Sequence, residues 1–143
     1  MLCDAKEENA LLQVLASELQ LLEQRPDIET SFIVHPDVLA DFYAFNDFLG
    51  RCDVLLKQLH FEGIYQVASF HPRYQFAGTD PDDAENYSNR SPYPMLHLLR
   101  EDSVERAVAG HPDIDSVPLT NINTLNELGK ETLEQLWRTC FDE

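Results

Sequence analysis

Basic residues are scarce in this chain. Its 143 residues include 10 Lys and Arg against 26 Asp and Glu, which gives a formal net charge of -16 at pH 7. Such a charge repels phosphate groups, and no basic stripe interrupts it. Nucleic acids and anionic membrane surfaces are therefore not expected as partners, whereas cations and basic proteins are favoured. A solvated acidic surface that keeps the protein soluble explains the same charge.

Cysteine and long apolar runs are also scarce. The three cysteines, Cys3, Cys52 and Cys140, are an odd number at spacings that match neither a disulfide framework nor a zinc site. We therefore expect a reducing, cytoplasmic location and no metal requirement. No apolar segment approaches the roughly 18 residues that a membrane span needs, and the N-terminus has no signal pattern. The sequence identifies no cofactor.

The spacing of the apolar residues predicts a single helix-rich α/β domain over residues 1–143. Leucines recur at helical spacing between Asp4 and Gln24, and a second stripe from Val38 to Leu59 predicts a long helix. Apolar segments at 29–35 and 64–70 predict two buried strands. Strand, helix and strand would then form a right-handed crossover in a small parallel sheet of two or three strands.

The rest of the chain is expected to be helical. The segment 95–100 predicts a helical turn, 103–109 a short helix, and 121–140 a closing helix. Gly129 can break this last helix, because glycine costs a helix about 1 kcal/mol relative to alanine.

The segment from Ala68 to Glu101 is the most unusual part of the chain. It exceeds the roughly 12 to 15 residues of an ordinary long loop, and its interleaved aromatic residues argue against disorder. We therefore expect an ordered, functional loop. It carries imidazoles, guanidiniums, carboxylates and amides: His71, His97, Arg73, Arg90, Arg100, Asp80, Asp82, Asp83, Glu85, Asn86 and Asn89.

Several phrases in this loop are specific: SFHP, YQFAGT, PDDAENY and NRSPYPMLHLLRE, preceded in the chain by FNDFLG. With them the chain closely resembles, from about Asp4 to Cys140, the bacterial domain-of-unknown-function family fourteen-fifteen. The resemblance implies no established activity, substrate or cofactor. Members of that family carry an upstream Cys-Pro phrase and a strand. The chain therefore looks truncated at its N-terminus, with Met1–Ala5 remaining of that strand.

Two histidines end the predicted strands, each followed by a proline. In a parallel sheet, His35 and His71 would lie at the same edge, where open α/β sheets bind ligands. His71, and less clearly His35, is then a candidate general acid–base or metal ligand. The alternative is that each proline stops a strand while the imidazole hydrogen-bonds a loop carbonyl.

The prolines of the loop direct the next helical turn, and we expect four side chains to converge beside the second strand: His71, His97, Arg90 and Arg100. His97 and Arg100, three residues apart, would share one helix face. The candidate catalytic residues are His71 and His97, and the candidate ligand-binding residues are Arg90, Arg100, Asn89, Tyr74 and Tyr93. Arginine suits bidentate binding of carboxylate or phosphate, although these arginines can instead neutralise the loop's own carboxylates.

The acidic cluster at 80–85 offers oxygen ligands for a cation. Its order, D-P-D-D-A-E, lacks the spacing and central glycine of a calcium-binding loop. Aspartates around a proline are typical of turns. We therefore expect a solvated turn and no metal site.

Two functional hypotheses remain open at the sequence level, and the sequence does not decide whether the protein is an enzyme. The first is a site for a small anionic ligand, with or without catalysis, at the loop 68–101. The second is a non-catalytic interaction or structural protein that displays this loop. A truncated sheet would leave an unpaired strand edge, so we also expect a homo-oligomer.

Overall fold

The computed structural model describes residues 1–142; residue 143, the last of the expected domain, lies outside them. The first half of the chain follows the expected order of α1 (Glu8–Gln24), β1 (Ser31–Val34), α2 (Phe42–Gln58) and β2 (Tyr65–Phe70). The second half comprises η1 (Ala84–Asn89), β3 (Met95–Arg100), α3 (Glu101–Gly110), η2 (Ile114–Ser116), α4 (Val117–Leu128), α5 (Lys130–Arg138) and η3 (Thr139–Phe141). Here η marks a short 3-10 helix.

The predicted parallel sheet is wrong. The sheet has three strands in the order β1-β3-β2, and β3 pairs antiparallel with both neighbours. Because β3 lies between them, β1 and β2 run in the same direction without pairing with each other. Met95 is opposite both Val34 and Phe70, so β1 and β2 end at the same level on either side of β3. His35 and His71 therefore do leave the sheet at the same edge, as predicted.

The segment 95–100 is the central strand and not the predicted helical turn. Its burial alternates: Leu96 and Leu98 are buried, whereas His97 and Leu99 are partly exposed. That period of two is the pattern of a strand with one face in the core. Two flanking strands satisfy its backbone on both sides, which outweighs the helix preference of its leucines.

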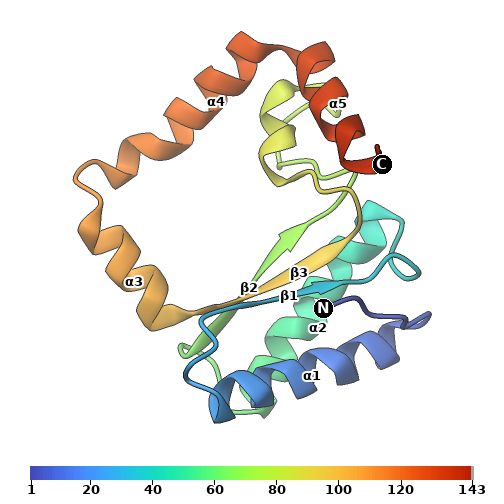
Figure 1. Ribbon diagram of the computed structural model, residues 1–143, viewed down its shortest axis with the longest axis vertical. Coiled ribbons are helices and arrows are strands. Elements are labelled where there is room, and N and C mark those ends of the chain that lie inside the picture. The colour runs from blue at the N-terminus through green and yellow to red at the C-terminus, as the bar shows by residue number, and fades with distance from the viewer. Residues whose placement is uncertain (143) are drawn as a thin grey trace.

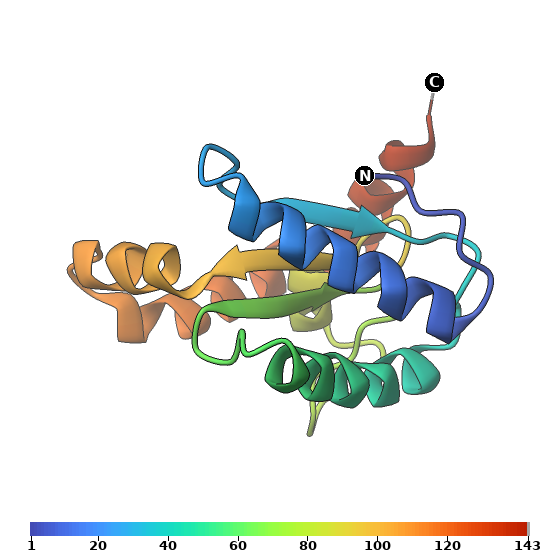
Figure 2. The same cartoon turned by 90° about the horizontal axis from the view of Figure 1, so that it is seen from below.

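One face of the sheet forms the core. The four leucines of the first predicted helix, 11, 15, 19 and 22, are all buried, and so are Phe45, Phe48, Cys52 and Leu56 of α2. They pack with Ile33, Leu96 and Leu98 of the sheet. Figure 2 shows α1 and α2 on the same side of the sheet. Neither α1 nor α2 lies on the opposite face of the sheet.

The C-terminal helices extend away from this core. Figure 1 shows α3 leaving the end of β3, α4 running across, and α5 returning beside η1. Gly129 has φ of 80° and separates α4 from α5, so the predicted break is confirmed. None of the helices within residues 1–142 has the length and apolar character needed to cross a membrane.

The N-terminus pairs with β1. Leu2 forms a parallel bridge with Val34, and the Cys3 N–H donates to the Val34 carbonyl at 2.8 Å. The edge of β1 is therefore covered at this point. An unpaired edge there no longer argues for self-association.

Candidate functional site

The loop between β2 and β3 is ordered by one buried amide. The Asn86 side-chain oxygen accepts from the Phe76 N–H at 2.9 Å and from the Thr79 hydroxyl at 3.0 Å. Its NH2 group donates to the Asp80 carbonyl at 2.9 Å. Asn86 is fully buried, so these bonds replace water that the amide cannot reach. The expected ordered loop is confirmed.

The acidic cluster forms a turn. The Asp83 carboxylate accepts from the Asp80 N–H, and the Asp80 carboxylate accepts from the Asp82 N–H, both at 2.9 Å. Lys130 forms an ion pair with Asp82 at 2.6 Å. Within the described part of the chain, no group of three or more His, Cys, Asp or Glu side chains is arranged to hold a metal ion.

His71 lies in the core, where both of its ring nitrogens are used. Nε2 donates to the Leu39 carbonyl at 3.0 Å, and Nδ1 accepts the Arg73 N–H at 3.0 Å. The ring packs against Phe42 and Phe45 of α2. Burial lowers the pKa of His71, so the imidazole is neutral at pH 7. These contacts are those of the structural alternative, an imidazole that ties a strand end to a loop.

His35 makes a parallel contact with the same loop. Its Nδ1 donates to the Val38 carbonyl at 3.1 Å, beside the carbonyl that His71 binds. Burial lowers its pKa as well, and its Nε2 has no hydrogen-bond partner among residues 1–142. Leu39 has φ of 62°, a left-handed conformation that is strained for leucine. The two imidazoles therefore hold a strained connection between β1 and α2.

His97 lies on the opposite face of the sheet from His71. Its ring stacks on Phe32 with 3.9 Å between centroids, and its Nε2 lies 2.7 Å from the Thr30 hydroxyl oxygen. That hydroxyl donates to the Leu98 carbonyl, so the imidazole is the donor to Thr30. Burial lowers the pKa of His97. The predicted cleft containing both histidines does not exist.

Arg100 is at the far end of the sheet from His71, opposite Tyr65 at the start of β2. In a strand, residues three apart face opposite sides, so Arg100 and His97 do not share a face. The Arg100 guanidinium donates to three carbonyls and one hydroxyl at 2.7 to 3.3 Å: those of Leu22, Arg25, Ile28 and Tyr65. It closes the turn between α1 and β1.

The remaining predicted ligand-binding residues are also engaged within the fold. Arg90 donates to the Tyr74 and Pro81 carbonyls at 3.1 and 2.7 Å, and its guanidinium stacks on Tyr87. The Asn89 amide donates to the Ser69 carbonyl at 3.1 Å. Tyr74 packs between Phe42 and Phe76, whereas Tyr93 is 45% exposed beside Phe141. The expected convergence of Arg90 and Arg100 with the two histidines is wrong.

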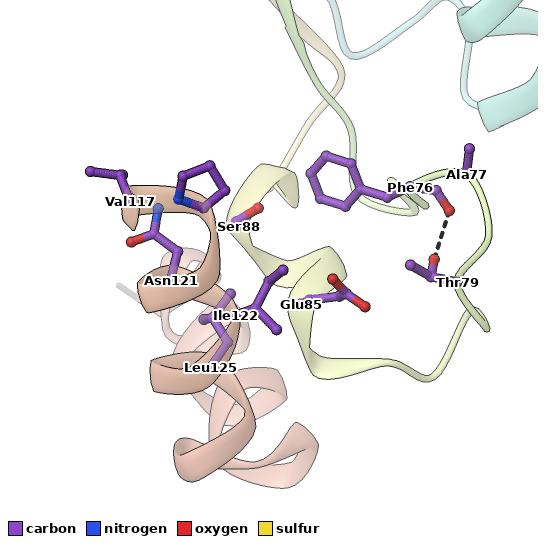
Figure 3. Close-up of a pocket in the computed structure, with 10 residues that line it drawn as sticks. Phe76, Ala77, Thr79, Glu85, Ser88, Val117, Asn121, Ile122 and Leu125 are labelled. Carbon is purple, nitrogen blue, oxygen red and sulfur yellow. Dashed lines mark hydrogen bonds between the residues drawn. The ribbon is translucent and has the colours of Figure 1, made fainter. Parts of the chain in front are cut away.

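The loop nevertheless forms one wall of an apolar groove, called the α4 groove below. Its volume is about 380 Å³, and it is lined by Phe76, Ala77, Thr79, Glu85, Ser88, Val117, Pro118, Asn121, Ile122 and Leu125. Figure 3 shows Ile122 and Leu125 on α4 and Glu85 on the neighbouring η1. No sequence pattern predicts this groove. Ile122 and Leu125 were assigned to the closing helix at 121–140, and Glu85 to the acidic turn.

A second depression lies at the start of α2. It has a volume of about 340 Å³ and is lined by Ala40, Asp41, Phe42, Tyr43, Pro72, Arg73, Gln75, Pro81 and Arg90. The Arg73 guanidinium forms no hydrogen bond or ion pair within residues 1–142. Asp41 caps α2 by accepting from the Ala44 N–H at 2.9 Å. The loop therefore presents the unpaired positive charge of Arg73 to this depression.

Comparison with known proteins agrees with the specific loop phrases. A family model described as a protein of unknown function (DUF1415) matches residues 1–135, which is most of the chain. No curated protein and no solved structure shows significant similarity to it. The chain therefore belongs to the DUF1415 family of proteins of unknown function.

Proposed function

We propose that this chain is a non-catalytic binding protein, and that its α4 groove takes a small apolar molecule bearing one cationic group. The observation that carries this proposal is Glu85, which lines an apolar groove and whose carboxylate forms no hydrogen bond or ion pair within the described residues. The proposed site still involves the loop 68–101. The proposed ligand is cationic and no longer anionic, because Arg90 and Arg100 donate to backbone carbonyls.

The apolar walls determine the kind of ligand. Phe76 and Ala77 come from the loop, whereas Val117, Ile122 and Leu125 come from α4. A volume of about 380 Å³ is within the range of roughly 300 to 1,000 Å³ that is usual for small-molecule sites. Binding there would bury apolar ligand surface at roughly 25 cal/mol per Å². An aromatic ring or a short aliphatic chain suits these walls.

Charge determines the remaining part of the ligand. Glu85 is half-buried, so water screens its carboxylate less than a fully exposed one, and an ammonium group beside it would gain more than at an open surface. The chain's net charge of -16 also raises the local concentration of cations. An apolar amine is therefore preferred to the matching alcohol or carboxylate.

Catalysis is not part of this proposal. General acid–base chemistry needs groups within about 2.6 to 3.2 Å of the atoms they serve. His71 uses both ring nitrogens inside the core, and His97 is on the other face of the sheet. Cys52 is no better candidate, because burial raises its pKa to about 12. None of these groups lines the α4 groove.

Thermal shift with three matched compounds tests the proposal: 2-phenylethylammonium, 2-phenylethanol and phenylacetate. At equal concentrations of the three compounds, we expect the ammonium compound to stabilise the protein most. Its stabilisation should reach about 2.7 kcal/mol at 100 times its dissociation constant. Glu85→Gln should weaken its binding about tenfold or more, since a hydrogen bond to a charged group is worth about 1.5 to 3 kcal/mol. Glu127→Gln, which removes an exposed carboxylate from α4, is the charge-matched control.

The proposal would be contradicted if Glu85→Gln and Glu127→Gln bound the ammonium compound with equal affinity. Equal stabilisation by the ammonium compound and the alcohol would also contradict it, because the carboxylate would then contribute nothing.

A second candidate is the anionic ligand that the sequence predicted, now placed in the depression at the start of α2. The unpaired Arg73 guanidinium favours it, and the N-terminus of α2 attracts anions. The Asp41 carboxylate opposes it, because this negative charge already caps the helix there. Under this alternative, phenylacetate would stabilise the protein and Arg73→Gln would abolish the effect.

A further inference from the structure

The chain exposes more surface than a compact protein of its size. Its accessible surface is 8984 Å², whereas a compact monomer of 16.4 kDa exposes about 7,500 Å², roughly 1,500 Å² less. A standard protein–protein interface covers about 800 Å² on each partner, and obligate dimers cover more. The excess is therefore large enough to supply one subunit's share of a stable dimer interface.

The sheet face opposite α1 and α2 supplies part of this surface. Alternation along the strands places eight side chains on this face, called the open face here: Phe32, Val34, Gln66, Ala68, Phe70, Met95, His97 and Leu99. Phe32 is 40% exposed and the others are partly exposed. Within the described residues, the strands place no Asp, Glu, Lys or Arg on the open face. In a chain with 36 such residues, an uncharged apolar face of this kind marks an interaction site.

The helix α3 also exposes apolar side chains. Val104, Ala107 and Val108 are spaced i, i+3 and i+4, so they share one side of the helix. Val108 is 45% exposed, and no residue of α3 or α4 is buried in the part of the chain that the structure describes. Figure 1 shows both helices extending away from the sheet. Packing against another apolar surface normally stabilises such a short helix.

We propose that a second copy of this chain covers the open face, with the Val104–Val108 side of α3 from each subunit packed on the sheet of the other. A two-fold axis makes this contact reciprocal, so each chain supplies both a sheet face and a helix. The contact is separate from the α4 groove. A self-contact is favoured over a basic partner, because the open face has no carboxylate with which a basic partner could pair.

Charge makes a further distinction between the two kinds of partner. Two chains of net charge -16 repel each other, and salt screens that repulsion, so the dimer should tighten as ionic strength rises. A contact with a basic partner would weaken under the same change. Salt dependence therefore separates the proposed contact from a charge-driven one.

Analytical ultracentrifugation of the full chain, from low to hundreds of micromolar, tests this proposal. We expect a species of twice 16.4 kDa whose dissociation constant falls as salt is raised. Val108→Glu should raise that constant at least tenfold. Val54→Glu, which alters a comparably exposed valine (53% exposed) on α2, should leave the dissociation constant unchanged. Val108 is exposed, so the folded monomer should survive its substitution, which circular dichroism would verify.

A chain that stays monomeric at every concentration and salt level would overturn the proposal, as would equal effects of the two substitutions. If Val108→Glu fails to fold, Phe32→Ser replaces it, with the same expectation and the same control.

Discussion

Lowering the pH from about 7.5 to about 5.5 should reduce the free energy of unfolding by up to about 2.7 kcal/mol through His35 and His71. Burial lowers the pKa of both imidazoles in the folded chain. Above the unfolded pKa of about 6.5, neither state binds the extra proton and stability is unaffected. Below it, the unfolded chain takes up protons that the folded chain refuses. Stability is therefore lost as the pH falls from about 6.5 toward the folded pKa.

Urea unfolding at a series of pH values measures this loss. His71→Gln removes one of these titrating groups, so its stability should change with pH by up to about 1.4 kcal/mol less over the same range. His60→Gln, which alters an exposed histidine, is the matched control. Comparing the pH dependence of each variant with that of wild type separates the contribution of the histidines from that of the many carboxylates. Identical pH dependence in wild type and His71→Gln would show that His71 is protonated equally in both states.

Arg100→Met should lower the free energy of unfolding by about 2 kcal/mol or more, since it leaves the part-buried carbonyls of Leu22 and Ile28 unpaired, at a cost of about 1 to 3 kcal/mol each. The guanidinium binds the carbonyls of Leu22, Arg25 and Ile28, and methionine keeps its apolar stem without its donors. Chemical denaturation measures the change. Arg106→Met is the matched control, because the exposed Arg106 donates to one neighbouring hydroxyl, that of Ser103.

A loss below about 0.5 kcal/mol for Arg100→Met, the usual range for surface substitutions, would contradict a structural role for this arginine. It would leave Arg100 available for the anion binding that the sequence first suggested.

Local patterns were sufficient to identify the helices and strands of the first half of the chain. The leucine spacing of α1 and the longer stripe of α2 report one buried face each. Both helices occur, although α1 begins at Glu8 and α2 at Phe42, later than the spacing predicts. The β-branched and aromatic segments of β1 and β2 are likewise strands. Each of these signals depends on neighbours close in sequence.

The segment MLHLLR shows where local patterns fail. Six residues rich in leucine fit a helical turn as well as a strand, and the choice depends on β1 and β2, which pair with it from distant parts of the chain. This one error determined the predicted site. His97 and Arg100 share a face if the segment is helical and lie on opposite faces if it is a strand.

The α4 groove was beyond sequence reasoning for a related reason. Glu85 of η1 and Ile122 of α4 line the same groove because the C-terminal helices return to η1 (Figure 1). The acidic run around Glu85 is typical of a turn, and most of it is one. Nothing in its pattern distinguishes the one carboxylate that lines an apolar wall.

Amide NMR of the labelled chain, titrated with 2-phenylethylammonium, tests the α4 groove most directly. We expect saturable shift changes confined to both of its walls, at Phe76–Thr79, Glu85–Ser88 and Asn121–Leu125, and their loss in Glu85→Gln. Absence of saturable changes at these residues would contradict the proposed function. Changes centred instead on Tyr43 and Arg73 would move the binding site to the depression at the start of α2.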